Sequence, residues 1–482
     1  MSPTASRFHH GFLHPLWHHL VIATLITCCV YWASTFGLTG ALDSATLYAT
    51  QRLISLHKPC AAKAPQTTVH VPPPVILEVT RQNYETTYEN TSPLDREALK
   101  NELTPVLAKT STAKLVVIDL DISPATPKQD TRDLDVLLDS PTGPPVVLVV
   151  PAFQGTPALT QRQSKWMKER CEADRQGRPL YFAFPYLSGE GGVILRYSEH
   201  YPSLGNVARW AAHREFPKGS SLLPASCKVA MHPDAICEFH KGAQDLDLLR
   251  EHFKLIRELC GTSPIDFESV APGRLVHRPL ETAPVDLAQY LTNNVVFVGG
   301  TYDSRDVHLT GAGPMDGVYV HAAIYSSKVT TLPHLYAFLI EITLGVALGF
   351  GFNWLFSAAT NADHSYQNRL YHQAVGAAMV AWAHWLFIVA VIFLLMIVAT
   401  VALIYASSSV LWRGSWLNPV PLVIGMLIDG FVASRTVSAV HYHTTAHFPG
   451  KVWWVKNASS LVSAALITIT LAYISFGAPH GH

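Results

Sequence analysis

Hydrophobic and polar positions divide the chain into a central segment of mixed composition and flanking segments that are almost wholly apolar. Residues 8–42 and 370–412 contain no Asp, Glu, Lys or Arg, and another uncharged run begins at residue 457. Between them, residues 43–328 have the charge and proline content of an ordinary globular domain. Because about 20 consecutive apolar residues are enough to cross a bilayer, the pattern predicts a globular domain held between transmembrane helices.

The apolar segments predict one transmembrane helix before the domain and three or four after it. The first is expected to be a retained anchor, because the apolar core of a cleaved signal peptide is only about 7–15 residues long. The fourth is short and contains Asp429, so a re-entrant segment with a cytoplasmic C-terminus is the alternative. The predicted order is a cytoplasmic N-terminus (1–15), a first span (16–40), a periplasmic domain (41–332), a second span (333–358), a cytoplasmic loop (359–373), a third span (374–408), a periplasmic loop (409–416), a fourth span (417–434), a cytoplasmic loop (435–457) and a fifth span (458–476).

Lysine and arginine are unevenly distributed over the short loops, and this bias predicts the orientation. With a cytoplasmic N-terminus, only Arg413 falls in a short outer loop. The basic residues that then face the cytoplasm are Arg7, Arg369, Arg435, Lys451 and Lys456. By the positive-inside rule, the sequence predicts a multi-pass protein of a bacterial inner membrane, with its large domain in the periplasm and the lipid bilayer as one partner.

Inside the central segment, uniformly apolar runs alternate with amphipathic ones. Four of the apolar runs are rich in Val and Ile, and they lie at 74–79, 114–119, 145–150 and 294–300. Strands that are apolar on both faces are typical of a parallel sheet covered by helices on each side. The sequence therefore predicts a layered α/β domain with a mainly parallel central sheet, although residues 156–268 show no regular pattern.

Three stretches of this domain carry a resemblance to a known family. A Pro-x-x-Arg turn leads into a helix at Ser92-Pro93-Leu94-Asp95-Arg96. A strand ends in Ile-Asp at Val117-Ile118-Asp119, with Asp130 further on. The closing signature comprises Gly299-Gly300-Thr301, Asp306-Val307-His308-Leu309-Thr310 and Met315-Asp316-Gly317-Val318-Tyr319-Val320-His321-Ala322-Ala323, and Trp416-Leu417-Asn418-Pro419-Val420-Pro421 precedes the fourth span.

On these residues the chain resembles the CHASE2 domain, an extracytoplasmic sensory module of bacterial membrane signalling proteins. The resemblance covers about residues 71–328 and the helices up to residue 435, and it implies ligand sensing and signal transduction. The chain departs from the family pattern in three ways. Asp316 stands where family members have proline, the fifth span is additional, and no kinase or cyclase output module follows the third helix after the domain.

The strand ends and the closing signature supply the candidate ligand-binding residues. These are Asp119, Gly299, Gly300, Asp306, His308 and His321. Ligands of parallel α/β sheets bind beyond the carboxyl ends of the strands, and a Gly-Gly pair there exposes backbone N–H groups to an anion or another ligand. The alternative is that the glycines form a tight turn and the polar side chains only cap turns or pack. A metal site is disfavoured because the candidate ligands show no close pairing.

Five cysteines lie in the globular segment, at positions 60, 171, 227, 237 and 260. In an oxidising compartment the candidate disulfide is Cys227–Cys237, and the odd number leaves at least one thiol free. The absence of a C-x-x-C pair argues against zinc binding and against thioredoxin-like chemistry.

Three polar residues fall inside the predicted spans, namely Glu341, His384 and Asp429. Such groups usually face the interior of a helical bundle or a partner. A b-type haem would need His18 or His19 to face His384. This is a minor alternative, and no cofactor is predicted.

The chain contains no nucleophile elbow, Walker loop, H-E-x-x-H motif or Rossmann fingerprint. Its net charge is zero without a basic tract, which argues against nucleic-acid binding. The sequence predicts a non-enzymatic sensor or adaptor that binds a small ligand or a protein and signals to a separate inner-membrane or periplasmic partner. The alternative is a structural docking subunit of a larger cell-envelope complex.

Overall fold

The chain folds into two compact units, one formed by residues 55–329 and the other by residues 1–54 and 330–482. The structure is a computed structural model. It describes residues 40–56, 74–92, 94–124, 132–151, 156–172, 178–187, 189, 192–214, 232–242, 251–254, 256, 262–271, 275–281, 284–327, 330–331, 343, 390, 394, 397–398, 400–408, 411 and 415–416.

A six-stranded parallel sheet forms the centre of the unit 55–329, in the order β4-β3-β2-β9-β1-β8. Its strands are β1 (Val75–Val79), β2 (Leu115–Asp119), β3 (Val146–Val149), β4 (Leu180–Ala183), β8 (Val276–Pro279) and β9 (Val295–Gly300). The central strands are buried on both faces, as uniform runs of Val, Ile and Phe require. The predicted α/β layer with a parallel sheet is confirmed.

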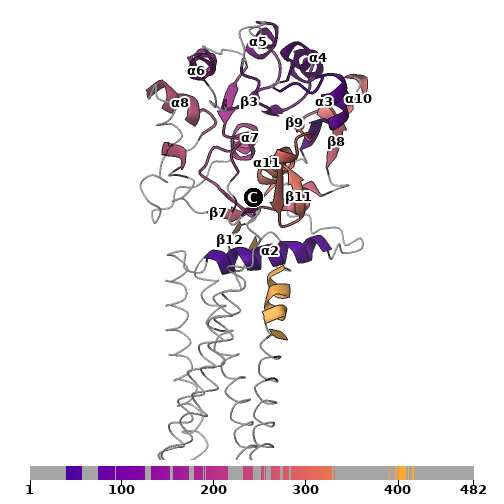
Figure 1. Cartoon of the computed structure of the whole chain (residues 1–482), viewed down its shortest axis with the longest axis vertical. Helices are drawn as coiled ribbons and strands as arrows, with labels where there is room; N and C mark the ends of the chain where they lie inside the picture. The colour runs from indigo at the N-terminus through magenta and orange to yellow at the C-terminus, as the bar shows by residue number, and fades with distance from the viewer. Residues whose placement is uncertain are drawn as a thin grey trace, which may run out of the picture. The chain divides into compact units, whose positions relative to one another are not determined.

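Helices cover both faces of this sheet (Figure 1). Helices α7 and α11 pack side by side, α7 against β2, β3 and β4 and α11 against β9 and β1, while α4, α5 and α10 lie on the other side. The helices of this unit are α3 (Arg81–Thr86), α4 (Arg96–Leu107), α5 (Arg132–Asp139), α6 (Pro157–Glu172), α7 (Leu204–His213), α8 (Ala235–Gly242), α10 (Pro284–Leu291) and α11 (Gly317–Ser326).

Short elements complete the unit beside the main sheet. A three-stranded sheet has the order β11-β10-β5, and β6 pairs antiparallel with β7. The elements are β5 (Val193–Ile194), β6 (Arg196–Ser198), β7 (Thr262–Pro264), η3 (Phe267–Val270), η4 (Ser304–Asp306), β10 (Val307–Thr310) and β11 (Gly313–Asp316).

Helix α11 is held against α7 by a close backbone approach. A Cβ at Gly205 would lie 2.5 Å from the carbonyl oxygen of His321, so only glycine lets the two helices come this near. At the end of α11, Arg209 Nε donates to the carbonyl oxygen of Tyr325 at 3.1 Å. These contacts fix the position of α11, which carries part of the candidate site.

A buried ion-pair network ties α4, α5 and α6 together. The Asp135 carboxylate accepts hydrogen bonds from Arg96 Nη2 at 2.7 Å and from Trp166 Nε1 at 3.0 Å, and it lies 2.6 Å from Arg170 Nη2. Arg96 and Arg170 are buried, at 3% and 5% exposure. Because Asp135 is the acid that Arg96 and Arg170 share, while Arg170 also reaches Asp139 at 3.2 Å, we expect Asp135 to be central to stability.

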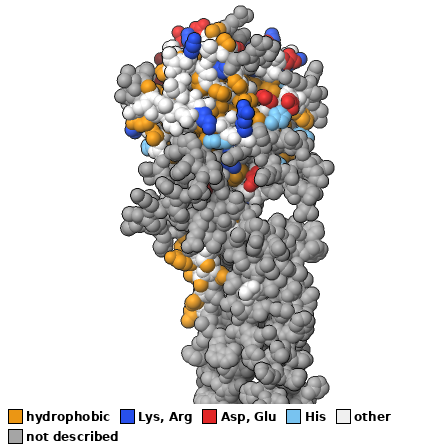
Figure 2. Space-filling view, turned by 180° about the vertical axis from the view of Figure 1, so that it is seen from behind, with side chains coloured by type: hydrophobic (Ala, Val, Ile, Leu, Met, Phe, Trp, Pro, Cys, Tyr) orange, Lys and Arg blue, Asp and Glu red, His pale blue; other side chains and the backbone are white. Residues whose placement is uncertain are grey.

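The second unit is described only in part. It contains α2 (Gly40–Leu56), which ends at the boundary between the units, and β12 (Thr330–Thr331), which pairs parallel with β13 (Ser415–Trp416). Its other described residues include helical positions with large exposed apolar side chains (Figure 2): Leu394, Ile397, Val398, Val401 and Tyr405.

The expected transmembrane helices and inner-membrane, periplasmic location are contradicted. None of the helices among the described residues is both long enough and apolar enough to cross a bilayer. Helix α2 overlaps the end of the first predicted span, but it has 17 residues and includes the charged residues Asp43 and Arg52. Most residues of the predicted spans lie outside the described residues, and so do Glu341, His384 and Asp429.

Candidate functional site

The register of the parallel sheet brings two carboxylates to the same edge. Asp119 at the end of β2 is level with Gly299 of β9, which in turn is level with Glu78 of β1. Side chains level with one another in adjacent strands point to the same face of a sheet. That face is covered by α11, since a Cβ at Gly299 would meet Val318. Gly299 thus lies between the two acids, and Val318 packs over it.

A loop and a hairpin between β9 and α11 add more charged groups at this edge. Asp306 ends η4, and its Oδ1 lies 3.3 Å from His308 Nε2 on β10. A Cβ on Gly317, the first residue of α11, would lie 2.6 Å from Asp306 Oδ1. The carboxylate therefore lies against the positive end of the helix dipole, which favours its negative charge. Asp316 is the N-cap residue of the same helix.

The Asp119 side chain is only 10% exposed. Among the described residues, its carboxylate accepts no hydrogen bond, and the His321 ring lies beside it, with Nε2 4.0 Å from Oδ1. Burial, and secondly the negative charge of Asp306, raise the pKa of Asp119 well above its usual value. A largely buried aspartate whose carboxylate has no hydrogen-bond partner in the protein is unusual.

His321 does not neutralise Asp119. Burial lowers the pKa of His321 to about 4, although Asp306 and the Pro185 carbonyl oppose this. Its Nε2 lies 3.2 Å from the Pro185 carbonyl oxygen, so in the neutral ring Nε2 carries the proton. Nδ1 is buried and has no hydrogen-bond partner among the described residues. At neutral pH the ring is therefore uncharged.

The two glycines at the end of β9 allow close packing. A Cβ at Gly299 would lie 2.6 Å from Cβ of Val318, and one at Gly300 would lie 2.5 Å from Cε1 of Tyr302. The Val318 and Tyr302 side chains thus lie directly over the glycine backbone. This packing accounts for both glycines without a bound anion.

The sequence pattern did not reveal the role of Glu78. Its Oε1 accepts a hydrogen bond from the Tyr319 hydroxyl and lies 3.1 Å from His277 Nδ1. Its negative charge also helps to raise the pKa of Asp316. Burial is the largest cause of that shift, and Asp306 is the next. The signal available in the sequence was one charged residue inside an otherwise apolar strand.

An aromatic pair lies beside these acids. Tyr84 of α3 and Tyr302 stack with ring centroids 4.1 Å apart and planes inclined by 9°. Burial, and then the neighbouring Tyr84, Asp303 and Asp306, raise the pKa of Tyr302 to about 12. Tyr302 therefore keeps its proton and presents a neutral ring next to Asp306.

The carboxyl edge of β1, β2 and β9 is consequently acidic. We call Glu78, Asp119, Asp306 and Asp316 the edge acids. Among the described residues, no Lys or Arg forms an ion pair with any of them. All six candidate residues predicted from the sequence lie in or beside this cluster. The charge disfavours an anion and favours a ligand that donates hydrogen bonds or carries positive charge.

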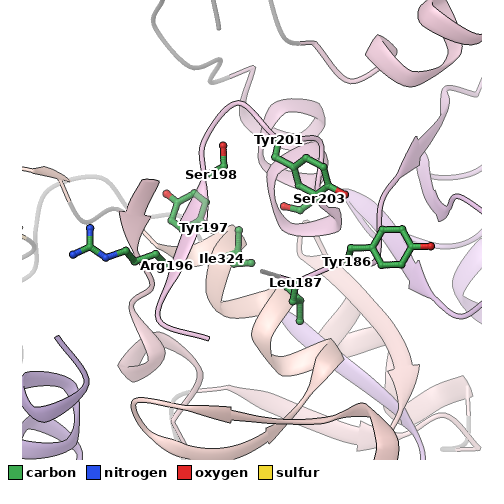
Figure 3. Close-up of a pocket in the computed structure, with 8 residues that line it drawn as sticks. All are labelled: Tyr186, Leu187, Arg196, Tyr197, Ser198, Tyr201, Ser203 and Ile324. Carbon is green, nitrogen blue, oxygen red and sulfur yellow. The ribbon is translucent and has the colours of Figure 1, made fainter. Parts of the chain in front are cut away.

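A separate small pocket lies away from the edge acids (Figure 3). Its lining residues are Tyr186, Leu187, Arg196, Tyr197, Ser198, Tyr201, Ser203 and Ile324. Ser198 Oγ is buried without a hydrogen-bond partner among the described residues. The space inside this partly open pocket suits a single water molecule rather than a metabolite.

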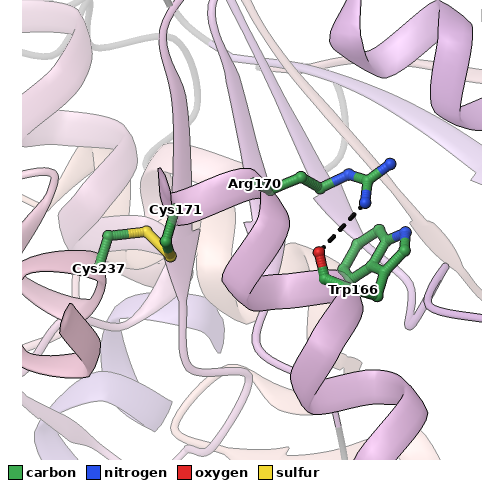
Figure 4. The surroundings of a disulfide bond; sticks show 4 residues. All are labelled: Trp166, Arg170, Cys171 and Cys237. Atoms are coloured by element: carbon green, nitrogen blue, oxygen red, sulfur yellow. Dashed lines mark hydrogen bonds between the residues drawn. A yellow bond between two sulfur atoms is a disulfide. The ribbon is translucent and has the colours of Figure 1, made fainter. Parts of the chain in front are cut away.

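The structure pairs Cys237 with Cys171, so the predicted Cys227–Cys237 disulfide is wrong (Figure 4). The two Cα atoms are 5.2 Å apart although 66 residues separate them in the sequence. They come together because α6 packs against α8, a contact that sequence spacing does not reveal. Cys227 lies outside the described residues.

Among the described residues, no group of three or more His, Cys, Asp or Glu side chains is arranged to hold a metal ion in this disulfide-bonded state. Comparisons of the chain with protein-family models, with curated proteins and with solved structures found no match. The resemblance to the CHASE2 domain therefore stays a prediction from the residues alone.

Proposed function

We propose that the unit 55–329 is the ligand-binding part of a non-enzymatic sensor or adaptor, and that its ligand is a small cation bound at the edge acids. The single observation that carries the proposal is Asp119. Its side chain is nine-tenths buried, its carboxylate has no hydrogen-bond partner among the described residues, and the negative charge of Asp306 acts on it. A protonated amine between the two acids would supply both the missing hydrogen bond and the missing positive charge.

Binding of such a ligand would also change the electrostatic interaction between the sheet and the loop that follows β9. Asp119 belongs to the rigid sheet, whereas Asp306 belongs to the loop that leads into the β10–β11 hairpin and α11. Without a ligand the two acids repel each other, and a bridging cation replaces this repulsion with attraction. A ligand shifts a conformational equilibrium only through such a difference in affinity. The resemblance to a sensory family supports the same interpretation.

The test is thermal unfolding of the full chain at pH 7 with matched pairs of small molecules. Putrescine and succinate have equal carbon chains, as do ethanolamine and glycolate. We expect an amine to raise the melting temperature in a saturable way, because a ligand that binds only the folded state stabilises it. The matched acids should have no effect.

The matched variants are Asp119→Asn and Asp303→Asn. Asp119→Asn should abolish the amine-induced shift. Asp303→Asn should keep it, because Asp303 is half-exposed and caps η4 by accepting from Arg305 N at 2.9 Å. Stabilisation by the carboxylic acids, or an unchanged amine response in Asp119→Asn, would contradict the proposal.

A docking role is the second candidate, and one observation favours it. Val307 and Leu309 on β10 are each 43% exposed, directly beside His308. If these side chains meet a protein, replacing both with Ser should weaken co-purification with that protein from native extracts. The amine response should survive the replacement, so the two functions are separable.

A further inference from the structure

His240 on α8 is a buried side chain with two unsatisfied ring nitrogens. It is 5% exposed, and neither Nδ1 nor Nε2 has a hydrogen-bond partner among the described residues. Burial, and secondly Lys168, lower the pKa of His240, whereas Glu172 raises it. Burying an imidazole without hydrogen bonds is unfavourable, and a neutral imidazole with a free nitrogen is a good metal ligand.

His240 shares helix α8 with Cys237, one of the two cysteines of the disulfide. Cys237 precedes His240 by three residues on α8, which places their Cβ atoms about 5–6 Å apart on one face of the helix. The Cys237 sulfur is bonded to that of Cys171 on α6, and both cysteines are buried, at 5% and 7% exposure (Figure 4). Lys168 and Glu172, whose charges shift the pKa of His240, flank Cys171 on α6. His240 therefore lies close to the part of α6 that carries the disulfide.

We propose that the Cys171–Cys237 disulfide covers a redox-gated zinc site, whose ligands after reduction are the two cysteine sulfurs and His240. Thiolate and imidazole are the ligands that zinc prefers, in tetrahedral geometry. Glu172, whose negative charge acts on His240, takes the fourth position in place of its contact with Lys168, where Oε1 lies 3.8 Å from Nζ. In the disulfide-bonded state the two sulfurs are bonded to each other. Among the described residues, this state shows no assembled metal cluster.

Reduction of the disulfide is balanced in electrons and protons when a dithiol is the reductant. The dithiol transfers two electrons and two protons, the Cys171–Cys237 bond breaks, two thiols form, and the reductant becomes a disulfide. Zn²⁺ then displaces the two thiol protons and binds the resulting thiolates. Two thiolates neutralise the charge of the ion, which suits a buried position.

The sequence contains all three proposed ligands, but their spacing does not match a common zinc motif. Cys237 and His240 form a C-x-x-H pair, while the third ligand lies 66 residues before Cys237. A search for C-x-x-C pairs excludes zinc here, because it assumes that the sulfur ligands are close in sequence. This assumption does not hold here, because the packing of α6 against α8 brings together cysteines that are distant in the sequence.

The test uses the full chain, reduced with a phosphine that is then removed under anaerobic conditions. Cobalt(II) is the probe, because thiolate ligation gives a charge-transfer band and tetrahedral geometry gives intense visible bands. We expect one cobalt ion per reduced chain, displaced by zinc, and none per oxidised chain. His240→Ala should weaken binding by more than the roughly 10–100-fold that loss of a supporting group causes.

His232→Ala is the matched control, because His232 begins the same segment but is part-exposed and pairs with Glu238 at 2.8 Å. It should bind cobalt like the unsubstituted chain. If reduction loosens the fold, zinc should raise the melting temperature of the reduced chain and leave that of the oxidised chain unchanged. Absence of cobalt bands in the reduced chain, or equal affinity in His240→Ala, would overturn the proposal.

Discussion

Asp135 and Asp119 are both largely buried aspartates of the same α/β unit, but their surroundings are opposite. Asp135 contacts two buried arginines and the indole nitrogen of Trp166. Asp119 has no hydrogen-bond partner among the described residues, and the charge that acts on it is the negative charge of another acid, Asp306. The first arrangement stabilises the fold. The second lowers stability until something positive binds, which is typical of a functional site.

The contrast between the two aspartates predicts its largest effect at Asp135. Replacing it with Ala leaves Arg96 and Arg170 buried without their shared acid, and we expect a loss of about 3–5 kcal/mol in the free energy of unfolding. Urea denaturation measures this loss. Asp133→Ala is the matched control on the same helix, since Asp133 is 63% exposed and, within the described part of the chain, forms an ion pair with Lys100 alone. Its loss should stay under about 0.5 kcal/mol, and equal losses in both variants would remove the structural role of Asp135.

A smaller effect is expected at Gly299, which separates Asp119 from Glu78. A Cβ there would lie 2.6 Å from Val318, so Gly299→Ala should lower the free energy of unfolding by about 1–3 kcal/mol through overpacking. Adding Val318→Ala should recover part of the loss, and a double-mutant cycle measures this coupling. If the two changes are simply additive, the edge is not closely packed and the glycine has another role.

The sequence predicted the sheet well and the site in part, for physical reasons. Strands such as β2 and β9 are uniformly apolar, and the rule that ligands bind at the carboxyl ends of strands pointed to Asp119 and Asp306. Glu78 was missed because only strand register makes it a neighbour of Gly299. The disulfide was mispaired because the packing of α6 against α8 joins residues that are distant in the sequence.

The same contrast predicts the smallest change at Asp119 itself. There a substitution should raise the free energy of unfolding instead of lowering it. Asp119→Asn removes the charge that repels Asp306, and the amide keeps the size of the side chain. We expect the free energy of unfolding at pH 8 to rise by an amount on the order of 1 kcal/mol. Asp135→Asn, the matched change at the paired acid, should lower it instead.

The dependence on pH identifies the cause of this gain. Burial and Asp306 raise the pKa of Asp119 in the folded chain, so the folded state binds this proton more tightly than the unfolded state does. The resulting penalty is absent below the unfolded pKa of about 3.9, grows as the pH rises, and is complete above the raised pKa. Unfolding measured between pH 4 and pH 9 should therefore show the Asp119→Asn variant gaining its advantage only as the pH rises. An advantage that is equal at every pH would mean that packing, and not charge, distinguishes the two aspartates.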